Sequence, residues 1–403
     1  MDLESHVALH GPLPVPPRRD DSWSEGFIDM VAASGLIGRG GAGFPTAEKL
    51  RWIRTQRRRP VVAVNAMEGE PASHKDEALA SLVPHLVLDG ASAVARCIDA
   101  RAISVCVPDR SDRAAQSFEH AIREREGWGI DPVPIAVLRP PGRFITGEES
   151  ALTSWLDRGD PLPRFRSDRP SILGVGGRPC LVDNAETLAH LALIVRHGAE
   201  SFRTAGTPDA PGTTLITISG AVGRGGVYEV PFGLPISSIL AMAGAPNRPA
   251  GVLLGGFGGT WLSPGRLDTL FEPVSLRVHG ATVGAGVLVV LPPQSCGLLE
   301  TARIASWMAS ESAGQCGPCA FGLPAVADDI SLLASGRADA ADLRRLEERL
   351  NSVDGRGACR HPDGVVRMVR SALSTFSEDV DRHLRADPCA GARMSSVMQL
   401  TRY

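Results

Sequence analysis

The sequence lacks a surplus of charge of either sign, and it has few aromatic residues. Its 403 residues include 42 basic and 45 acidic side chains, which gives a formal net charge of -3. Dedicated nucleic-acid-binding proteins normally carry a basic excess, so this balance argues against that class and we expect no nucleic-acid partner. Aromatic residues make up 5% of the chain, so an aromatic side chain in a loop is more informative than usual.

Long apolar runs are also missing. No run reaches the roughly 18 residues that a membrane-spanning helix needs, so we expect no integral membrane segment. Residues 1–25 are acidic and then proline-rich, without the basic and apolar regions of a secretory signal, and we expect them to form a mobile leader. These absences predict a cytoplasmic protein whose eight cysteines are free thiols or ligands rather than disulfides.

The residues that are present point to several domains, because the chain is too long for one ordinary core. Strand-like and helix-like stretches alternate from residue 60 to residue 140, which predicts a parallel α/β sheet in a domain over 26–205. β-branched stretches broken by glycines then predict a small α+β domain over 206–292. Apolar residues spaced by about 3.6 positions predict a helical domain over 293–390.

A glycine-rich stretch, "GLIGRGGAGFPT" at 35–46, lies near the start of the α/β region. Consecutive glycines allow several backbone N–H groups to converge on an anion, and they allow a flat ring to lie against bare backbone. Arg39 and Lys49 add positive charge. The stretch therefore predicts a site for a phosphate-bearing cofactor, with a flexible surface loop as the alternative.

Two acidic stretches strengthen the prediction of a cofactor site. "VNAMEGEP" at 64–71 follows a predicted strand, and "FITGEESAL" at 144–152 precedes a predicted helix. Ligands of open α/β sheets bind at the carboxyl ends of the strands, although each stretch taken alone also fits a solvated acidic loop. The residues of interest in them are Asn65, Glu68, Glu70, Gly147, Glu148 and Glu149.

Together these stretches resemble a known family, the FMN- and NADH-binding 51 kDa flavoprotein subunit of respiratory complex I, with related chains in NAD-reducing hydrogenases and formate dehydrogenases. The family's G-R-G-G-A-G-F-P-T is intact at Gly38–Thr46, and its N-A-D-E-x-E-P is found at Asn65–Pro71 with Met67 in place of the aspartate. Its Y-I-C-G-E-E-T-A-L matches 144–152, and its N-N-V-E-T-L-A matches "DNAETLA" at 183–189. The resemblance covers roughly residues 30–385.

The resemblance implies an α/β fold with a Rossmann-like FMN/NADH domain, a ubiquitin-like β-grasp (SLBB-type) domain and a small helical bundle with the iron–sulfur motif. It also implies hydride transfer from NADH to FMN, which is chemistry of the cofactors, so no side chain is expected as acid or base. By the same resemblance, FMN would be held by Gly38, Arg39, Gly40, Lys49, Asn65, Gly147, Glu148, Asp183, Asn184 and Thr187. NADH would face Gly41, Phe44, Glu70 and Glu149, and Glu68 and Arg166 complete the cofactor-binding set.

Several positions depart from the family pattern, among them Met67, Phe144, Trp52, Asp183 and Arg169. Asp183 replaces an asparagine and would place a carboxylate beside FMN, where its charge would disfavour the anionic reduced flavin. Arg166 keeps a positive charge of the family, but Arg169 replaces a stacking aromatic residue and can stack on adenine or contact a phosphate. These changes leave the nicotinamide cofactor open between NADH and NADPH.

The iron–sulfur motif of the family, E-S-C-G-x-C-x-P-C with a fourth cysteine about forty residues further on, reads "ESAGQCGPC" here. By resemblance, Cys316, Cys319 and Cys359 are three of the four ligands of a [4Fe–4S] cluster, while Ala313 stands at the fourth position and cannot ligate iron. Either an outside ligand completes the cluster, or the cluster is lost and the helices remain as a scaffold. The outside ligand would be water, Ser312 or Glu311. Cys296 or Cys389, which lie outside the motif, could also replace the missing cysteine.

Two further interpretations of the cysteines remain. The sequence C-G-P-C is that of thioredoxin, but here it follows a predicted helix instead of a buried strand, which argues against a thioredoxin-like role. Cys97 and Cys106 lie in apolar segments and are expected to be buried structural residues.

We therefore expect an FMN-dependent, NAD(P)H-oxidising electron-transfer protein that passes electrons to an iron–sulfur partner subunit or a ferredoxin. The alternative is a re-purposed homologue that keeps the fold, with or without flavin, as a non-catalytic assembly or regulatory subunit. A third possibility, ligand binding by the β-grasp domain, rests on "GGFGGTW" at 255–261, although glycine pairs commonly form turns.

Overall fold

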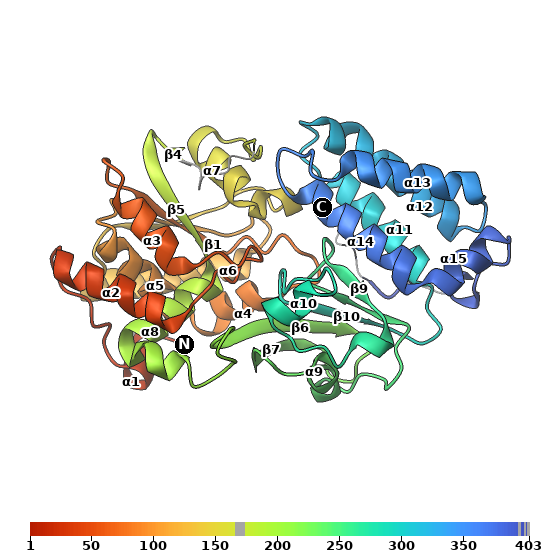
Figure 1. Ribbon diagram of the computed structural model, residues 1–403. Coiled ribbons are helices and arrows are strands. Elements are labelled where there is room, and N and C mark those ends of the chain that lie inside the picture. The colour runs from red at the N-terminus through yellow and green to blue at the C-terminus, as the bar shows by residue number, and fades with distance from the viewer. Residues whose placement is uncertain (166–173, 394–395, 399, 401–403) are drawn as a thin grey trace. The chain divides into compact units, whose positions relative to one another are not determined.

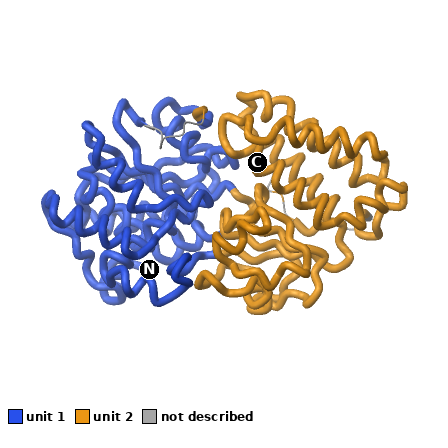
Figure 2. The backbone as a smooth tube through the Cα atoms, viewed as in Figure 1, with its two compact units in different colours: residues 1–69, 74–163, 167–215 blue, residues 70–73, 164–166, 216–403 orange. Residues whose placement is uncertain are grey.

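The computed structural model describes residues 1–165, 174–393, 396–398 and 400, and the chain divides into two compact units. Unit 1 holds Met1–Gly69, His74–Pro163 and residues 174–215, while unit 2 holds Glu70–Ser73, residues 164–165 and the described chain from Ile216 onward (Figure 2). The short segment Glu70–Ser73 thus belongs to the second unit although it lies between two parts of the first.

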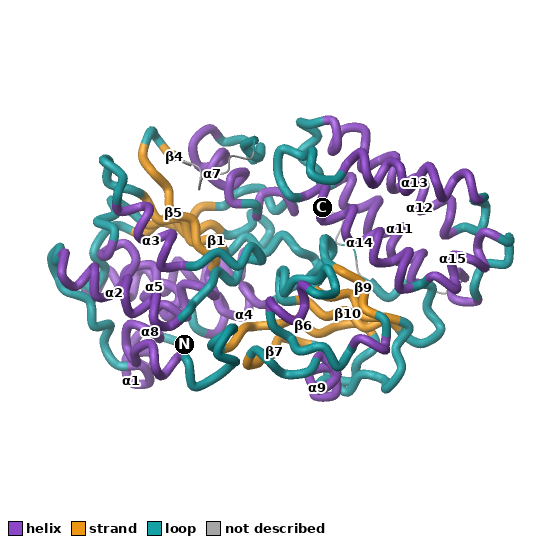
Figure 3. The backbone as a smooth tube through the Cα atoms, viewed as in Figure 1, coloured by secondary structure: helices purple, strands orange, loops and turns teal. Residues whose placement is uncertain are grey.

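Unit 1 is an α/β unit in which helices surround a five-stranded sheet (Figure 3). Its strands are β1 (Val61–Asn65), β2 (Ile103–Cys106), β3 (Ile135–Leu138), β4 (Gly174–Val175) and β5 (Arg178–Asn184). Its helices are α1 (Leu3–His10), α2 (Asp21–Ser34), α3 (Thr46–Arg54), α4 (Lys75–Leu82), α5 (Pro84–Cys97), α6 (Asp112–Trp128), α7 (Glu149–Arg158) and α8 (Ala185–Phe202), with a 3₁₀ turn η1 at Phe144–Gly147.

The sheet has the strand order β3-β2-β1-β5-β4, and all pairs except β4 with β5 are parallel. Strands in the central positions are buried on both faces, which explains the near-continuous apolar run of β1. Its Val62 and Val64 join the large core beneath the sheet, while Ala63 faces a smaller cluster that includes Leu152 of α7. This confirms the parallel α/β sheet that the alternation of stretches predicted.

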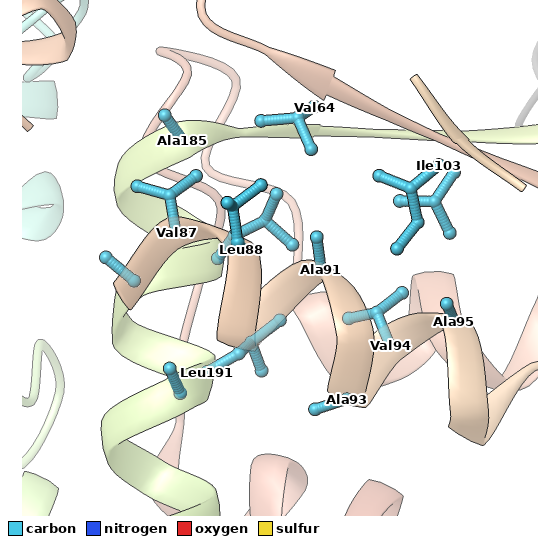
Figure 4. Packing of buried hydrophobic residues seen from close by; sticks show 14 of the residues in the cluster. Val64, Val87, Leu88, Ala91, Ala93, Val94, Ala95, Ile103, Ala185 and Leu191 are labelled. Atoms are coloured by element: carbon cyan, nitrogen blue, oxygen red, sulfur yellow. The ribbon is translucent and has the colours of Figure 1, made fainter. Parts of the chain in front are cut away.

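Helices α5 and α8 pack against each other beneath the sheet (Figure 4). Val87, Leu88 and Val94 of α5 belong to the same buried cluster as Leu191 of α8. The contact is close because Gly90 has no side chain. A Cβ at Gly90 would lie 1.8 Å from the carbonyl oxygen of Leu188. Glycine in mid-helix costs some helix stability, and here it permits the backbone approach.

The first residues, expected as a mobile leader, contain helix α1 and the start of α2 (Figure 1). The Asp2 carboxylate accepts a hydrogen bond from the Ser5 N–H and caps α1. Leu3 and His6 are buried, and the His6 imidazole lies 2.7 Å from a carboxylate oxygen of Asp89. The helix is short, so its sequence carries little periodicity, and its stability depends on these contacts with distant residues.

Unit 2 contains a second five-stranded sheet followed by helices. The sheet segment comprises β6 (Thr213–Gly220), β7 (Gly226–Pro231), α9 (Ile236–Met242), β8 (Gly251–Leu254), β9 (Thr260–Leu262), η2 (Pro264–Arg266), α10 (Pro273–Arg277) and β10 (Val287–Leu291). The helical segment comprises α11 (Gly297–Ser310), the π-helical turn η3 (Pro318–Gly322), α12 (Leu323–Ala334), α13 (Ala340–Val353), α14 (His361–Thr375), α15 (Ser377–Leu384) and η4 (Ala390–Arg393).

The second sheet has the strand order β7-β6-β10-β8-β9. Its central strand, β10, pairs in parallel with β6 and antiparallel with β8. This order, with a helix between the second and third strands, is that of the β-grasp fold expected from the sequence. The turn at Gly255–Gly259 joins β8 to β9, and the Glu70 carboxylate of the same unit accepts a hydrogen bond from the Phe257 N–H at 2.8 Å.

Among the residues described, no single helix has both the length and the apolar composition to cross a membrane. The bent pair α4 and α5 meets the test only when the two helices are taken together, and they meet at 96°.

Candidate cofactor site and iron–sulfur region

The carboxyl ends of β1 and β5 bring together three of the stretches singled out in the sequence. Asn65 ends β1, Asn184 ends β5, and the two are paired in the sheet register. The Asn65 amide donates to the Gly147 carbonyl oxygen at 2.9 Å, which holds the η1 turn next to β1. Ligands of open parallel sheets bind at this edge, so the geometry agrees with the predicted location.

The glycine-rich stretch joins the same edge. The Arg39 N–H donates to the Thr187 hydroxyl in the first turn of α8 at 2.9 Å. A Cβ on Gly40 would lie 3.4 Å from the Cβ of Asn184, and Gly41 has a φ of 97°, which favours glycine. Phe44, on the same stretch, is 41% exposed, so an apolar ring is available to a ligand from this loop.

The Arg39 side chain, expected to add positive charge to the site, instead points into unit 1. Its guanidinium donates to the Thr213 carbonyl oxygen at 3.0 Å and lies 4.0 Å from the Glu186 carboxylate. Burial of the charge lowers the pKa of Arg39 to about 10. The Arg39 backbone therefore contributes to the loop, and its side chain contributes to the interior.

Glu186 is the centre of a buried charge network that the sequence analysis did not identify. Its carboxylate accepts from the Thr214 hydroxyl at 2.9 Å and from the Leu215 N–H at 2.8 Å, and it lies 3.0 Å from the Lys75 ammonium. Burial opposes the Glu186 charge, but Lys75 and other groups outweigh it and hold its pKa far below the usual range. Glu186 lies inside the "DNAETLA" motif at 183–189, so its place in that motif could have identified it as a candidate residue from the sequence.

Lys49 forms an ion-paired cluster with two carboxylates. Its ammonium lies 3.4 Å from Asp183 and 3.3 Å from Glu149, and it also donates to the Val182 carbonyl oxygen. Burial works against the Lys49 charge, but Asp183 and Glu149 outweigh it and raise the pKa of Lys49. Burial raises the pKa of Asp183 despite the attraction of Lys49. On this side of the site the Asp183 carboxyl is therefore harder to ionise than usual, whereas the Lys49 ammonium is harder to deprotonate.

The acidic residues of the site have different partners. Glu148 is the N-cap of α7, where its carboxylate accepts from the Ala151 N–H at 2.8 Å, and burial raises its pKa. Glu68, with a φ of 34°, accepts from the N–H groups of Asp76 and Glu77 at the start of α4. Helix-end contacts of this kind explain part of the acidic character of both stretches without a ligand.

Several buried side-chain oxygens in the site segments have no hydrogen-bond partner in the described structure. They are the second carboxylate oxygen of Asp183 and the hydroxyls of Thr46 and Thr146. Unpaired buried polar atoms are costly, so these three oxygens are polar groups for which the described residues supply no partner. A flavin mononucleotide has a flat ring and both donors and acceptors, so the bare glycine backbone of 38–43 and the amides of Asn65 and Asn184 fit that cofactor.

The three motif cysteines lie in unit 2, where Cys319 interacts with both Cys316 and Cys359. The Cys316 thiol accepts hydrogen bonds from the backbone N–H groups of Ala358 and Cys319, and these lower its pKa although burial opposes the change. Burial raises the pKa of Cys319 to about 12, with smaller contributions from Cys316 and Cys359. Ala313 precedes this group on the turn after α11 and offers no ligand atom.

Comparisons with known proteins agree with this architecture. Residues 31–193 match the Nuo51 FMN-binding domain, and residues 300–383 match the NADH-ubiquinone oxidoreductase-F iron–sulfur binding region. The chain is 30% identical to an F-type subunit of the NADH-quinone oxidoreductase of Rhizobium meliloti over 377 residues, which cover 90% of each protein.

The chain belongs to the complex I 51 kDa flavoprotein family. The F-type subunit of the Streptomyces coelicolor NADH-quinone oxidoreductase is also 30% identical, over 380 residues that cover 90% of this chain and 84% of that protein. A solved NAD+-reducing [NiFe]-hydrogenase in the H2-reduced state has a similar fold, with a TM-score of 0.83 and 30% identity. That match covers 90% of this chain and 63% of the hydrogenase chain.

Family membership confirms the resemblance drawn from the motifs, while the predicted contact of Glu70 with NADH stays a prediction. Glu70, expected to face NADH, belongs to unit 2, where it accepts hydrogen bonds from the N–H groups of Ala72 and Phe257. Gly256 is required beside it, because a Cβ there would lie 2.4 Å from a Glu70 carboxylate oxygen. Arg166 and Arg169 lie outside the described residues, so their predicted roles keep the status of sequence predictions.

Proposed function

We propose that this family member oxidises NADH with FMN held in unit 1 and passes the electrons singly to an iron–sulfur centre or an iron–sulfur partner. The observation that carries the proposal is the convergence of the glycine-rich stretch, the η1 turn and the ends of β1 and β5 on one sheet edge. Similarity along most of the chain to F-type subunits of NADH-quinone oxidoreductases supports the same activity.

The protein's part in this reaction is binding and electrostatics. FMN, when bound, supplies hydride acceptance and one-electron release. The bare backbone of Gly38, Gly40 and Gly41 would hold it, together with Asn65, Asn184, Thr187 and the Gly147 turn. Lys49 places positive charge at the site, and Asp183 opposes it with a carboxylate. A negative group beside the reduced cofactor lowers its reduction potential, because it disfavours added negative charge.

We further propose that Cys316, Cys319 and Cys359 bind an iron–sulfur cluster whose fourth ligand comes from outside the motif. The support is their proximity in unit 2 and the match of residues 300–383 to the iron–sulfur region. The sequence supports three further proposals. The protein uses NADPH as an alternative to NADH, residues 206–292 and 293–390 form separate domains, and the protein is cytoplasmic.

The first experiment is an anaerobic absorption spectrum of the purified full chain before and after stoichiometric NADH, with iron determined on the same sample. Bleaching of flavin bands together with bound iron supports both parts of the proposal. Bleaching without iron leaves the hydride step standing and rejects the cluster. Absence of bound flavin, or flavin that neither NADH nor NADPH reduces, rejects the activity. Cys359→Ser should abolish iron binding, whereas Cys97→Ser, at a buried cysteine of unit 1, should not.

The carboxylate of Asp183 provides an independent test. Asp183→Asn restores the family's residue and removes one negative charge, so it should raise the midpoint potential of the bound flavin while FMN remains bound. An unchanged or lower potential would show that Asp183 does not act on the cofactor. The measurement is an anaerobic redox titration against a dye of known potential.

A further inference from the structure

Unit 2 contains a second group of soft ligand atoms, separate from the cysteines of the iron–sulfur motif. Cys296 is the N-cap of α11, His383 lies in the last turn of α15, and Cys389 precedes η4. Their two sulfurs and one imidazole nitrogen all lie within 4.8 Å of one another, and all three residues are buried. Within the described part of the chain, no other three His, Cys, Asp or Glu residues meet this condition.

Two glycines hold the segments of this group close together. A Cβ on Gly391 would lie 2.3 Å from the Gln294 carbonyl oxygen and 2.4 Å from the Cys296 nitrogen. A Cβ on Gly297 would lie 2.2 Å from the Phe376 ring, just before α15. The backbone after α15 therefore contacts the backbone at the start of α11. This contact fixes the segments that carry Cys296 and Cys389 relative to each other.

The orientation of His383 suits a metal ligand. Its Nδ1 lies 3.1 Å from the Leu333 carbonyl oxygen, which can only accept, so Nδ1 carries the proton. In the neutral ring Nε2 then carries the lone pair, which accepts the Cys389 N–H at 3.1 Å and lies 3.8 Å from the Cys296 sulfur. A bound metal would take the place of the Cys389 N–H at this lone pair. Metal-bound histidines commonly have their second nitrogen held by a carbonyl in this way.

The spacing of the ligand atoms also suits one small tetrahedral ion. With zinc–sulfur bonds of about 2.3 Å and zinc–nitrogen bonds of about 2.0 Å, the edges of a tetrahedral site are about 3.5–3.8 Å. The separation of 3.8 Å between the Cys296 sulfur and His383 Nε2 is slightly longer than the sulfur–nitrogen edge of about 3.5 Å, so a small inward shift would bring both atoms onto one ion. The Leu299 N–H, at the start of α11, points at the Cys296 sulfur at 3.4 Å and favours its thiolate form.

We propose that Cys296, His383 and Cys389 bind a zinc-class divalent ion that joins the end of the helical segment to the start of α11. Two thiolates and one imidazole are a donor set that zinc prefers. Binding displaces one proton from each thiol, and a solvent molecule takes the fourth position. The role is structural, and it does not depend on the FMN reaction or on the cluster of Cys316, Cys319 and Cys359.

The alternative is a set of buried thiols and an imidazole that only hydrogen-bond to each other. The two possibilities differ in a simple way. A bound metal requires loss of the thiol protons and therefore binds more tightly as the pH rises, whereas hydrogen-bonded thiols bind none.

The test uses the full chain with Co2+ and Zn2+ as probes. Metal-depleted protein is titrated anaerobically with Co2+, and a thiolate-to-cobalt charge-transfer band is followed and then displaced by Zn2+. We expect one tight site that persists in Cys316→Ser, in addition to any Co2+ that Cys316, Cys319 and Cys359 bind once their iron is removed. Cys296→Ser, Cys389→Ser and His383→Gln should each weaken Zn2+ binding by more than the roughly 10–100-fold typical of changes outside the ligand shell.

Two controls separate this site from other cysteines. Cys316→Ser should remove iron but leave the Co2+ band, and Cys97→Ser should leave both. Far-UV circular dichroism identifies any variant that fails to fold. Because there are three ligand variants, the test still works if one of them does not fold. The proposal is overturned if the band disappears only in Cys316→Ser, if the ligand variants bind Zn2+ like the unaltered chain, or if anaerobically purified protein contains a Cys296–Cys389 disulfide.

Discussion

Replacement of Lys49 by methionine should destabilise the FMN-free protein through the carboxylate it leaves behind. Lys49 lies 3.4 Å from Asp183, whose side chain is 6% exposed, and 3.3 Å from Glu149, whose side chain is 44% exposed. Methionine keeps most of the apolar stem and removes the charge. Glu149 can turn to solvent, so the cost should come mainly from Asp183, which has no described partner on its second oxygen.

The size of the effect follows from the geometry. At an effective dielectric constant of about 20, two unit charges at this distance attract by about 5 kcal/mol, and the regained hydration of Lys49 offsets part of that. Breaking a buried pair by removal of one partner costs about 3–5 kcal/mol. The loss of stability cannot exceed the free energy of protonating Asp183, because the carboxyl can become neutral instead. Neutralising a carboxyl of ordinary pKa at pH 7 costs about 4 kcal/mol. We expect a loss of about 3 kcal/mol at pH 7.

The pH dependence gives this prediction its sign. Burial already raises the pKa of Asp183, and loss of Lys49 should raise it further. A carboxyl whose pKa is higher in the folded state destabilises the fold increasingly as pH rises from its unfolded-state pKa to its folded-state pKa, so lowering the pH within this window relieves the cost. At pH 5 the ceiling set by protonation falls to about 1.5 kcal/mol. Lys49→Met should therefore lose at least about half of its effect between pH 7 and pH 5.

The assay is urea denaturation of FMN-free protein at both pH values. Arg51→Met is a matched control on the same helix, because its pair with Asp29 at 3.1 Å is exposed on both sides and should contribute less than about 1 kcal/mol. The double variant Lys49→Met/Asp183→Asn should recover most of the loss. A cost below about 1 kcal/mol for Lys49→Met, or a double variant no more stable than the single one, would refute the reasoning.

Three further outcomes are expected. Glu186→Gln should cost about 3 kcal/mol at neutral pH; because the folded-state pKa of Glu186 is depressed, its contribution should be lost as pH falls below the ordinary carboxyl range, which denaturation across a pH series measures. Gly90→Ala should prevent stable folding, as seen by circular dichroism, whereas Gly127→Ala, a helical glycine with no nearby atom, should be tolerated. In cluster-free protein at pH 8, iodoacetamide should modify Cys316 before Cys319, as peptide mass spectrometry would show, because their thiol pKa values move in opposite directions.

The elements with strong local patterns were predictable from the sequence. The apolar runs of β1 and β2 and the helical spacing of α5 and α6 gave the parallel sheet, since each pattern matches one structural period. The motifs also located the edge of the sheet where Asn65, Asn184 and the Gly147 turn meet. Helix α1 was missed because its eight residues are stabilised by distant contacts such as that between His6 and Asp89.

Side-chain roles were harder to predict than positions. An acidic residue after a strand can bind a ligand or cap a helix, and Glu68 and Glu148 accept from backbone N–H groups at helix starts. The charge of Arg39 was predicted for the site, but its partners Thr213 and Glu186 lie far along the chain. The grouping of Cys296 with His383 is likewise a tertiary contact across 87 residues, which no local spacing reveals.

The pairing of β1 with β5 has a consequence for synthesis of the chain. These neighbours in the sheet are joined by Asn65 and Asn184, which are 119 residues apart in the sequence. Contacts of such separation form slowly, because a long loop must close before they contribute. On the ribosome, β1 and β2 can emerge early, yet the sheet edge stays open until β5 and the start of α8 have left the exit tunnel. A nascent chain halted before that point would expose the apolar strand β1 and could not yet hold a flavin, so cofactor loading belongs to a late stage of folding.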